Sequence, residues 1–527
     1  MERRDALRLL AYSGATLTNI GAVGSFFQQA FASGTRVSDT YGVTILVDGW
    51  RADMFKKMLL DGELPNIKKH LVDRGSTVEN FVGSFPSTTG PAHLPYINGV
   101  VPGHNNCPGL RWVDRNTQEI RDYCTIDNFF FNSDFPGENF TIYEMLRDQL
   151  TACIFDFASR GAKLALRPDI KTLWWAMTGN IKAWEMMDEN AVRKFEQIYD
   201  KTEIPRYTFV WMPALDHLCH VYGVTSEQVR LRALGIDDQI RRITEKLQKA
   251  RIYDNTVISL VADHGLRDTH TNTDPRETLQ SYGLNVMEDL TETGTFTSLK
   301  RYNTARGVSG NGFAMLYFSK QKNIRGIITN DWSNPVQYDE LRDFHVPGNG
   351  RIDLIKELRK EKSIKLVMAK KREDVYMVFS KNGEGMIERE FSNFRYSSKG
   401  SDPLGFDKIS ESKNLKNGKY HDKDIWFGAT TKSNHPDALF QISQLFDSRR
   451  CGEIVLSSEP GYDFLIEGHK ATHGGLEKAE IMVPCVIAGP GIKQGIIPTA
   501  RSVDIYPTYL KSLGIPKFDG EVLNVFS

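Results

Sequence analysis

Apolar residues along the chain gather into short runs that read as buried strands. Four such runs, rich in β-branched or aromatic residues, cover positions 41–47, 206–212, 256–262 and 481–488, and residues 77–82, which include Glu79 and Asn80, are a further candidate strand. Continuous apolar runs of this length, without strict alternation, are typical of strands covered on both faces.

Helical patterns occupy several of the segments between these strands. Residues 52–73 carry apolar side chains at helical spacing, and residues 226–250 form a long amphipathic pattern. Residues 87–97 begin with hydroxyl side chains and a Gly-Pro pair, which is typical of the start of a helix. Strands that alternate with helices predict an α/β fold, a three-layer α/β/α sandwich around a mostly parallel sheet.

Two less regular regions interrupt the alternation. Residues 129–200 are rich in aromatic residues and are predicted to be mainly helical, whereas residues 294–433 are charged and punctuated by glycine. Within the second region, residues 375–379 and 386–390 flank Lys381-Asn382-Gly383 and predict a hairpin. We interpret both regions as insertions that shape access to a site, the second being an inserted cap at about 294–433 within one domain of residues 33–527.

The first 32 residues have the pattern of an export signal. Arg3 and Arg4 precede a weakly apolar stretch, and Ala30-Phe31-Ala32 offers a small-x-small cleavage site. The pattern resembles a bacterial twin-arginine signal and predicts a periplasmic or secreted protein; the alternative is an ordinary amphipathic helix. The stretch is too polar for a membrane span, and because no other segment has 18 consecutive apolar residues, no transmembrane helix is expected.

Composition narrows the classes of partner. The chain has 527 residues, with 66 Lys and Arg against 66 Asp and Glu. A neutral chain has no bulk field that draws it onto nucleic acid or anionic lipid, so no nucleic-acid binding is expected and phosphate recognition must be local. The six cysteines include no CxxC pair, which argues against a thiolate zinc site, and Cys107 and Cys124 are the nearest pair for a disulfide in an oxidising compartment. The oligomeric state is not predicted.

Five short segments place Asp, His or Thr after a predicted strand, at a helix start, or close to one of these. Ligands of open α/β sheets bind at the carboxyl ends of the strands, so these side chains are candidates for one site. The segments are Val47-Asp48-Gly49, residues 85–93, residues 215–220, Val261-Ala262-Asp263-His264-Gly265 and Thr472-His473-Gly474-Gly475.

Each segment alone has an ordinary structural explanation. An Asp after a strand, or a hydroxyl at a helix start, is commonly a helix cap, and a lone histidine is more often structural than ligating. The functional reading gains support from Asp216 and His220, which are four residues apart and share one face of a helix, as in half of a zinc site. A metal-bound hydroxyl at a helix N-terminus, such as that of Thr89, would be deprotonated readily and could attack phosphorus.

The order of these segments resembles the alkaline phosphatase superfamily, and in particular its type I phosphodiesterase/nucleotide pyrophosphatase family. That family carries an Asp after the first strand, then Pro-Thr-x-Thr-x-Pro-x-His, Asp-x-x-x-His, Asp-His-Gly and a late His-Gly. The matching residues here are Asp48, Pro86-Ser87-Thr88-Thr89-Gly90-Pro91-Ala92-His93, Asp216 with His220, Asp263-His264-Gly265 and His473-Gly474, followed by a similar closing segment at 501–520.

The resemblance implies a metal-dependent hydrolase that cleaves phosphodiester or phosphoanhydride bonds in small phosphate esters. It implies two divalent ions, usually zinc, one held by Asp216, His220 and His473. The other would be held by Asp48, Asp263, His264 and the Thr89 hydroxyl. Thr89 matches the second Thr of the family segment, so it would be the nucleophile and would pass through a phosphothreonine intermediate.

Two positions depart from the family pattern. Gly90 stands where the family has Phe or a similar apolar residue, and Leu110 stands where it has an Asn that contacts phosphate. Arg111, next to Leu110, and Asn106 are therefore candidate substrate-binding residues, with Asn105 as an alternative. An Arg fork would favour a more highly charged group, whereas Arg111 could equally pair with an acidic neighbour.

Other functions stay open on these departures. Arg111 leaves a phosphomonoesterase, a phosphonate hydrolase or a phospho-headgroup transferase of the same superfamily as alternatives. A catalytically inactive binding protein with the same fold would be a different functional class. The presence of a suitable residue at every expected ligand position argues against it. That class predicts a protein that binds no metal.

Overall fold

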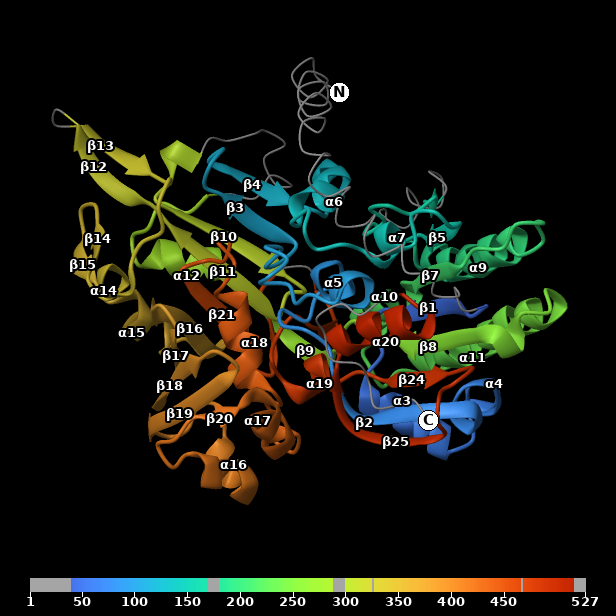
Figure 1. The fold of residues 1–527 in the computed structure, drawn as a ribbon. Helices are drawn as coiled ribbons and strands as arrows, with labels where there is room; N and C mark the ends of the chain where they lie inside the picture. The colour runs from blue at the N-terminus through green and yellow to red at the C-terminus, as the bar shows by residue number, and fades with distance from the viewer. Residues whose placement is uncertain (1–38, 169–179, 288–298, 325–326, 466–467, 516–527) are drawn as a thin grey trace, which may run out of the picture.

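The structure, a computed structural model, contains two eight-stranded sheets that lie side by side (Figure 1). We call described residues 39–287 and 468–515 the parallel body, and residues 299–465 the antiparallel body. The export signal predicted at residues 1–32 lies outside the part of the chain that the structure describes. The described residues are 39–168, 180–287, 299–324, 327–465 and 468–515.

The sheet of the parallel body has the strand order β25-β2-β24-β8-β1-β7-β5-β6. Its pairs are parallel except those of β24, which runs antiparallel to β2 and β8. The central strand β1 is buried from its second residue to its last, as expected of a strand with both faces covered. The predicted α/β fold with a mostly parallel sheet is therefore confirmed. The strands are β1 Tyr41–Val47, β2 Gly75–Val82, β5 Thr151–Ile154, β6 Leu164–Leu166, β7 Tyr207–Met212, β8 Thr256–Val261, β24 Cys485–Ala488 and β25 Gly495–Arg501.

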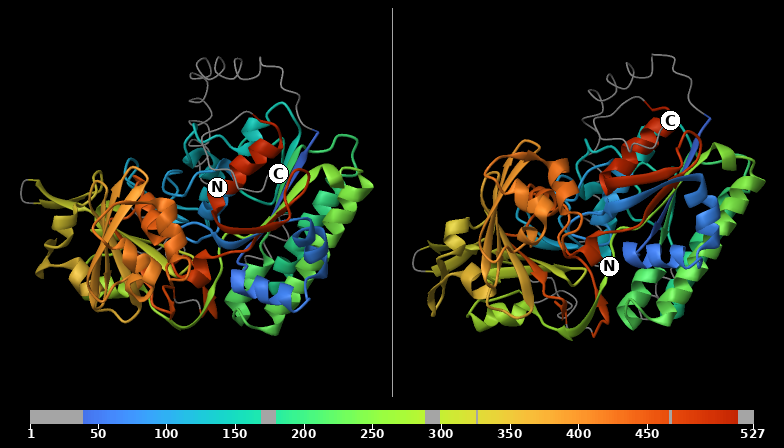
Figure 2. Two further views of the ribbon diagram at one scale, coloured as in Figure 1. Left: turned by 60° about the horizontal axis from the view of Figure 1, so that its bottom comes forward. Right: turned by 90° about the horizontal axis from the view of Figure 1, so that it is seen from below.

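Helices cover both faces of this sheet (Figure 2). The predicted helix at 226–250 is confirmed as α11 (Glu227–Lys249), whose first turn is capped by the Ser226 hydroxyl at 3.4 Å from the Val229 amide. The predicted helix at 52–73 is divided into α3 (Ala52–Leu60) and α4 (Pro65–His70), because the chain turns before Pro65, which opens the second helix. The other helices around this sheet that matter here are α5 Leu94–Asn98, α9 Ile181–Ile198, α10 Ala214–Tyr222, α19 Lys478–Ile481 and α20 Ile505–Ser512.

The antiparallel body is built on the second sheet, in the order β10-β11-β21-β16-β17-β18-β19-β20. The predicted hairpin is confirmed, with Met377 opposite Met386 in β17 and β18. Strand β21 lies between β11 and β16 although it follows residue 433 in the sequence, so this sheet uses chain on both sides of that position. The elements are β10 Thr304–Ser309, β11 Phe313–Phe318, β16 Ile364–Arg372, β17 Val375–Ser380, β18 Gly383–Glu390, β19 Asn393–Gly400, β20 His421–Asp422, α17 Lys423–Thr430, α18 Ala438–Leu445 and β21 Ile454–Ser458.

The mainly helical prediction for residues 129–200 is wrong in part. Besides α6 (Phe131–Asp134), α7 (Ile142–Met145) and α9, this region contains the strands β5 and β6 of the parallel sheet. Strand β5 is four residues long, and a run that short cannot be assigned to strand or helix by periodicity. Tertiary pairing with β7 decides its conformation.

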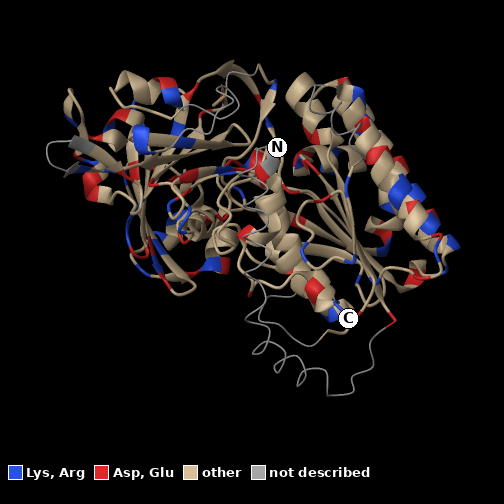
Figure 3. Cartoon of the chain, turned by 90° about the horizontal axis from the view of Figure 1, so that it is seen from above, with Lys and Arg blue, Asp and Glu red and all other residues tan. Residues whose placement is uncertain are grey.

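Acidic and basic residues are intermixed along the described chain of both bodies (Figure 3), in keeping with a sequence of no net charge. No disulfide bond joins Cys107 and Cys124 in the described chain. Cys107 is buried, which raises the pKa of its thiol to about 12, and Cys124 is exposed. Among the described helices, none combines the length and the hydropathy needed to cross a membrane.

Candidate metal centre

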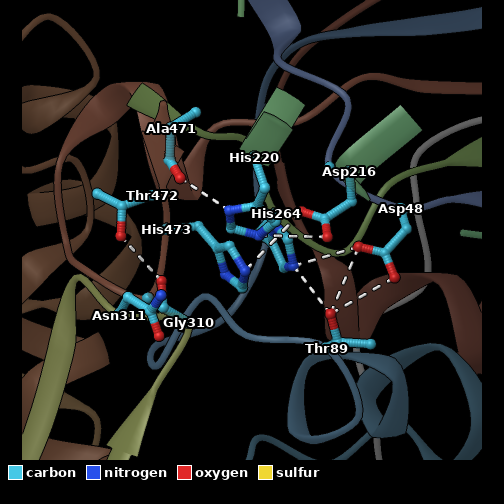
Figure 4. Close-up of polar contacts among 12 residues, drawn as sticks. Asp48, Thr89, Asp216, His220, His264, Gly310, Asn311, Ala471, Thr472 and His473 are labelled. Atoms are coloured by element: carbon cyan, nitrogen blue, oxygen red, sulfur yellow. Dashed lines mark hydrogen bonds and ion pairs between the residues drawn. The ribbon is translucent and has the colours of Figure 1, made fainter. Parts of the chain in front are cut away.

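Four neighbouring strands of the parallel sheet bring an acidic residue to the same edge. Asp263 follows β8, Asp48 follows β1, Asp216 lies in the first turn of α10 after β7, and Asp156 follows β5. Parallel strands end at one edge, so residues far apart in the sequence meet there. Figure 4 shows the resulting cluster, in which the Thr89 hydroxyl faces Asp48 and His264.

Asp216, His220 and His473 form the first group of candidate metal ligands, called the first ligand group below. His220 Nε2 lies 3.4 Å from Asp216 Oδ2, and His473 Nε2 lies 3.8 Å from Asp216 Oδ1. The other ring nitrogens contact carbonyl oxygens, His220 Nδ1 to Ala471 O at 2.7 Å and His473 Nδ1 to Ser87 O at 2.8 Å. A carbonyl only accepts, so each Nδ1 donates and each Nε2 turns toward the carboxylate, as in metal-ligating histidines.

Asp48, Asp263, His264 and Thr89 form the second group. Thr89 Oγ1 lies 3.4 Å from both carboxylate oxygens of Asp48 and 3.2 Å from His264 Nε2. The same imidazole nitrogen lies 3.3 Å from Asp48 Oδ1 and 3.2 Å from Asp263 Oδ2. The rings of His264 and His473 stack at 3.7 Å between centroids, so the two groups adjoin.

The electrostatics of the cluster fit a bound cation. Burial, together with the charges of Asp263 and Asp216, raises the pKa of Asp48 well above its ordinary value. Within the described chain, the buried Oδ1 of Asp216 has no hydrogen-bond partner. Closely spaced buried carboxylates, one of them with an oxygen that accepts no hydrogen bond, are costly without a compensating positive charge.

The donor set also fits the metal expected from the sequence. Ligand atoms of Asp216, His220 and His473 lie within 4.8 Å of one another, as do those of Asp48, Asp216 and His264. Burial alone would lower the pKa of His220, but Asp216 raises it to about 9. A cation at this position would replace that proton. Imidazole nitrogens with carboxylate oxygens suit zinc.

His93 and Asp156 support this centre and were not among the predicted site residues. His93 Nε2 lies 3.1 Å from Asp263 Oδ2, and its Nδ1 lies 2.7 Å from Asp156 Oδ2, with all three side chains buried. Burial alone would lower the pKa of His93, but Asp156 raises it well above its ordinary value. Because carboxylates engage both ring nitrogens, His93 orients Asp263. Asp156 could have been found as an Asp after a strand, had β5 been predicted.

Aromatic side chains complete the surroundings of Thr89. Trp211 donates from Nε1 to Asp48 Oδ2 at 2.8 Å, which fixes that carboxylate. Gly90 has a φ of 87°, and a Cβ at this position would lie 2.6 Å from the ring of Phe157. Phe157 stacks on His93 with 5.7 Å between centroids. The departure at Gly90 therefore has a packing reason, because Phe157 fills the space beside it.

The structure gives the two predicted substrate-binding residues partners within the protein. Arg111 donates from Nε to Asp122 Oδ2 at 2.9 Å and from Nη1 to Val308 O at 3.2 Å. Asn106 accepts from the Ser448 hydroxyl at 2.8 Å. The predicted metal ligands and Thr89 lie together, whereas Arg111 and Asn106 are engaged with other protein groups.

Comparisons with known proteins bear on the fold and the family. A family model described as type I phosphodiesterase / nucleotide pyrophosphatase matches residues 43–478. An uncharacterized pyrophosphatase/phosphodiesterase of Schizosaccharomyces pombe is 23% identical over 247 residues, which are 46% of this chain and 48% of the relative. The chain thus spans about half the length of that curated relative.

Solved structures share the fold at low identity. Murine ectonucleotide pyrophosphatase/phosphodiesterase 5, as an inactive threonine-to-alanine variant in complex with AMP, has a TM-score of 0.51 at 12% identity. The match covers 93% of this chain and 100% of that chain. The human counterpart has a TM-score of 0.50 at 13% identity, covering 92% of this chain and 97% of that chain.

Proposed function

Because the chain belongs to the type I phosphodiesterase/nucleotide pyrophosphatase family, we propose that it hydrolyses phosphodiester or phosphoanhydride bonds of small molecules with Thr89 as nucleophile. The observation that carries the proposal is the position of the Thr89 hydroxyl, 3.4 Å from Asp48 and 3.2 Å from His264. A hydroxyl surrounded by metal-type ligands is the arrangement that in-line displacement at phosphorus requires.

The residues would hold two divalent ions, which we propose to be zinc. Asp216, His220 and His473 would hold one ion. The other would be held by Asp48, Asp263, His264 and the Thr89 hydroxyl. Bound there, the ions would supply positive charge that favours the alkoxide of Thr89 and offsets the charge of the phosphoryl oxygens.

The chain itself provides the nucleophile and its orientation. Thr89 Oγ1, having passed its proton to solvent, attacks phosphorus as the bond to the leaving oxygen breaks, which gives a phosphothreonine. The leaving oxygen takes up a proton from water, and the first product departs. Water then cleaves the Thr89–phosphorus bond, releases the phosphate-bearing product and restores the hydroxyl. Trp211 and His93 keep Asp48 and Asp263 in place during both steps.

The contacts of Arg111 favour a diester over the monoester alternative. A monoester carries more negative charge than a diester, and an added cation would favour it. The Arg111 guanidinium instead pairs with Asp122, which offsets its charge. A phosphomonoesterase, a phosphonate hydrolase or a headgroup transferase thus receives no support from this residue.

We also propose export through residues 1–32, as their sequence predicts.

Hydrolysis of bis(p-nitrophenyl) phosphate and p-nitrophenyl phosphate by the zinc-loaded protein tests the proposal. We expect the diester to be preferred and Thr89→Ala to be inactive on it. Thr88→Val is the matched control, because Thr88 is buried next to the nucleophile and its hydroxyl makes no hydrogen bond within the described chain. Preference for the monoester would overturn the substrate class. Full activity in Thr89→Ala would overturn the nucleophile.

A further inference from the structure

Helix α18 of the antiparallel body forms hydrogen bonds with the main chain just before Thr89. The Phe85 amide donates to Gln441 Oε1 at 3.0 Å, and Gln444 Nε2 donates to Phe85 O at 2.6 Å. Both glutamines lie on α18, three residues apart and thus on one face of the helix, and both are fully buried. Two side chains therefore bind both polar groups of one residue, four positions before the nucleophile.

Further contacts fix the orientation of each glutamine side chain. Gln444 Oε1 accepts from the Gly103 amide at 2.8 Å, and since an amide N–H only donates, the oxygen of Gln444 must face it. Gln441 Nε2 donates to Asp437 Oδ2 at 3.0 Å. Arg501 holds that Asp437 carboxylate through two hydrogen bonds of 2.8 Å. Neither amide can rotate without losing a buried partner.

Only residues 86–88 separate Phe85, which the two glutamines hold, from the nucleophile Thr89. Between Phe85 and Thr89, the Ser87 hydroxyl donates to Gly475 O at 2.8 Å and accepts from the Gly474 amide at 3.1 Å. The Ser87 carbonyl accepts from His473 Nδ1 at 2.8 Å. A shift of the Phe85 peptide would therefore move the nucleophile and would also disturb an imidazole of the first ligand group.

We propose that Gln441 and Gln444 are positioning residues, through which the antiparallel body sets where the Thr89 hydroxyl lies relative to its reaction partners. The proposal rests on the role of Thr89 as nucleophile. Neither glutamine is among the candidate metal ligands, and both bind main chain, so their effect is on geometry. Displacement of a nucleophile by about 1 Å is enough to slow a reaction roughly 100-fold.

Two substitutions of Gln444 test the proposal in the zinc-loaded protein. Gln444→Met keeps the length of the side chain and leaves Phe85 O and the Gly103 amide unpaired. Gln444→Glu keeps an acceptor for Gly103 and loses the donor to Phe85 O and to Gln441 O, the second of which lies within the same helix. The matched control is Ser443→Ala on the same helix, because that buried hydroxyl bonds only to Phe440 O within the helix.

We expect kcat for bis(p-nitrophenyl) phosphate to fall about 10- to 100-fold in both Gln444 variants, with KM changed less than about 3-fold and bound zinc per chain unchanged. In the zinc-free protein, amide hydrogen exchange of residues 83–90 should quicken in both variants. Ser443→Ala should match the natural protein in all four measurements.

Three outcomes decide the matter. Wild-type kcat per zinc-loaded chain in both variants, beside an inactive Thr89→Ala, would overturn the positioning role and leave the proposed function standing. A Gln444→Met variant that unfolds, with a folded Gln444→Glu variant of normal kcat and normal exchange, would show a role in stability alone and would also overturn it. Activity in Thr89→Ala would instead contradict the proposed function.

Discussion

The two sheets of the molecule have different roles, because one is mostly parallel and the other is antiparallel. In the parallel body, β8, β1, β7 and β5 end at one edge, and each delivers an Asp to it. In the antiparallel body neighbouring strands end at opposite edges, so the ends of adjacent strands do not lie side by side. The clustered metal-type ligands of the described chain all belong to the parallel body. The parallel strands bring the candidate ligands together, and the antiparallel body contacts the loops of the site.

Contacts at His473 and Phe85 show how the antiparallel body holds the loops of the site. The His473 amide donates to Gly310 O at 3.0 Å, and the Gly312 amide donates to His473 O at 2.6 Å, both across the boundary between the bodies. Phe85 packs edge-on against Phe313 of β11 with 5.3 Å between centroids. The antiparallel body thus contacts the main chain of the site, whereas the parallel body supplies its ligands.

Asp216→Asn should have the largest effect, because ligand atoms of Asp216 lie within 4.8 Å of those of His220 and His473 and also of those of Asp48 and His264. We expect kcat/KM for the diester to fall about 1,000-fold or more, with at least one zinc lost per chain, since an amide is a weaker ligand and leaves the site short of charge. Kinetics and metal analysis measure both. Asp339→Asn, an exposed residue of the antiparallel body, is the control and should change neither. A fully active Asp216→Asn would break the comparison.

Two histidines, His435 of the antiparallel body and His220 of the parallel body, should respond to pH in opposite directions. Burial lowers the pKa of His435, in the antiparallel body, to about 4, whereas Asp216 raises that of His220. Unfolded His435 would bind a proton near pH 6.5 and folded His435 only near pH 4. Its contribution to stability is therefore complete above pH 6.5 and is lost as pH falls toward 4, by about 3 kcal/mol.

Urea unfolding between pH 8 and pH 4 measures this contribution. His435→Asn keeps a side-chain donor for Leu404 O, which His435 Nδ1 contacts at 3.2 Å, and removes the titrating group. The variant should lose less stability on acidification than the natural protein does. Equal losses in both proteins would show that His435 does not carry the acid sensitivity of its body.

Asp156→Asn should lower activity or zinc affinity about 10- to 100-fold, the range found when residues that orient metal ligands are changed. The substitution removes the charge that holds His93, and His93 holds Asp263. Metal titration and kcat/KM give the answer. An unchanged Asp156→Asn variant would mean that only three of the four strand ends serve the site.

Trp211→Phe should have the smallest effect. An aromatic ring is retained, although a smaller one, and a single hydrogen bond to the Asp48 carboxylate is lost, so we expect kcat/KM to fall about 10-fold, in line with about 1.5 kcal/mol for a hydrogen bond to a charged group. Steady-state kinetics on the diester measure the change. A loss as large as that of Asp216→Asn would show that the indole shapes the substrate site itself.

The sequence indicated most of the candidate ligands that the structure brings together, for a physical reason. Strands β1, β7 and β8 are buried on both faces, so they stand out as apolar runs, and Asp48, Asp216 and Asp263 follow them closely. Strand β5 is too short to be recognised, and Asp156 was missed with it. Gln441 and Gln444 bind main chain of Phe85, a contact that leaves no pattern in the order of side chains.

The hydrogen bond between His473 and Ser87 also bears on the stage of folding at which the site is complete. It spans 386 residues, and the nearby contact of Ser84 with Ser502 spans 418. Contacts of such separation form late, because the loop they close must first be ordered. During synthesis, the acidic residues at the strand ends would meet before His473 had left the ribosome. Zinc binding with full affinity would therefore belong to the finished chain, and a chain cut short before residue 473 would retain an incomplete centre.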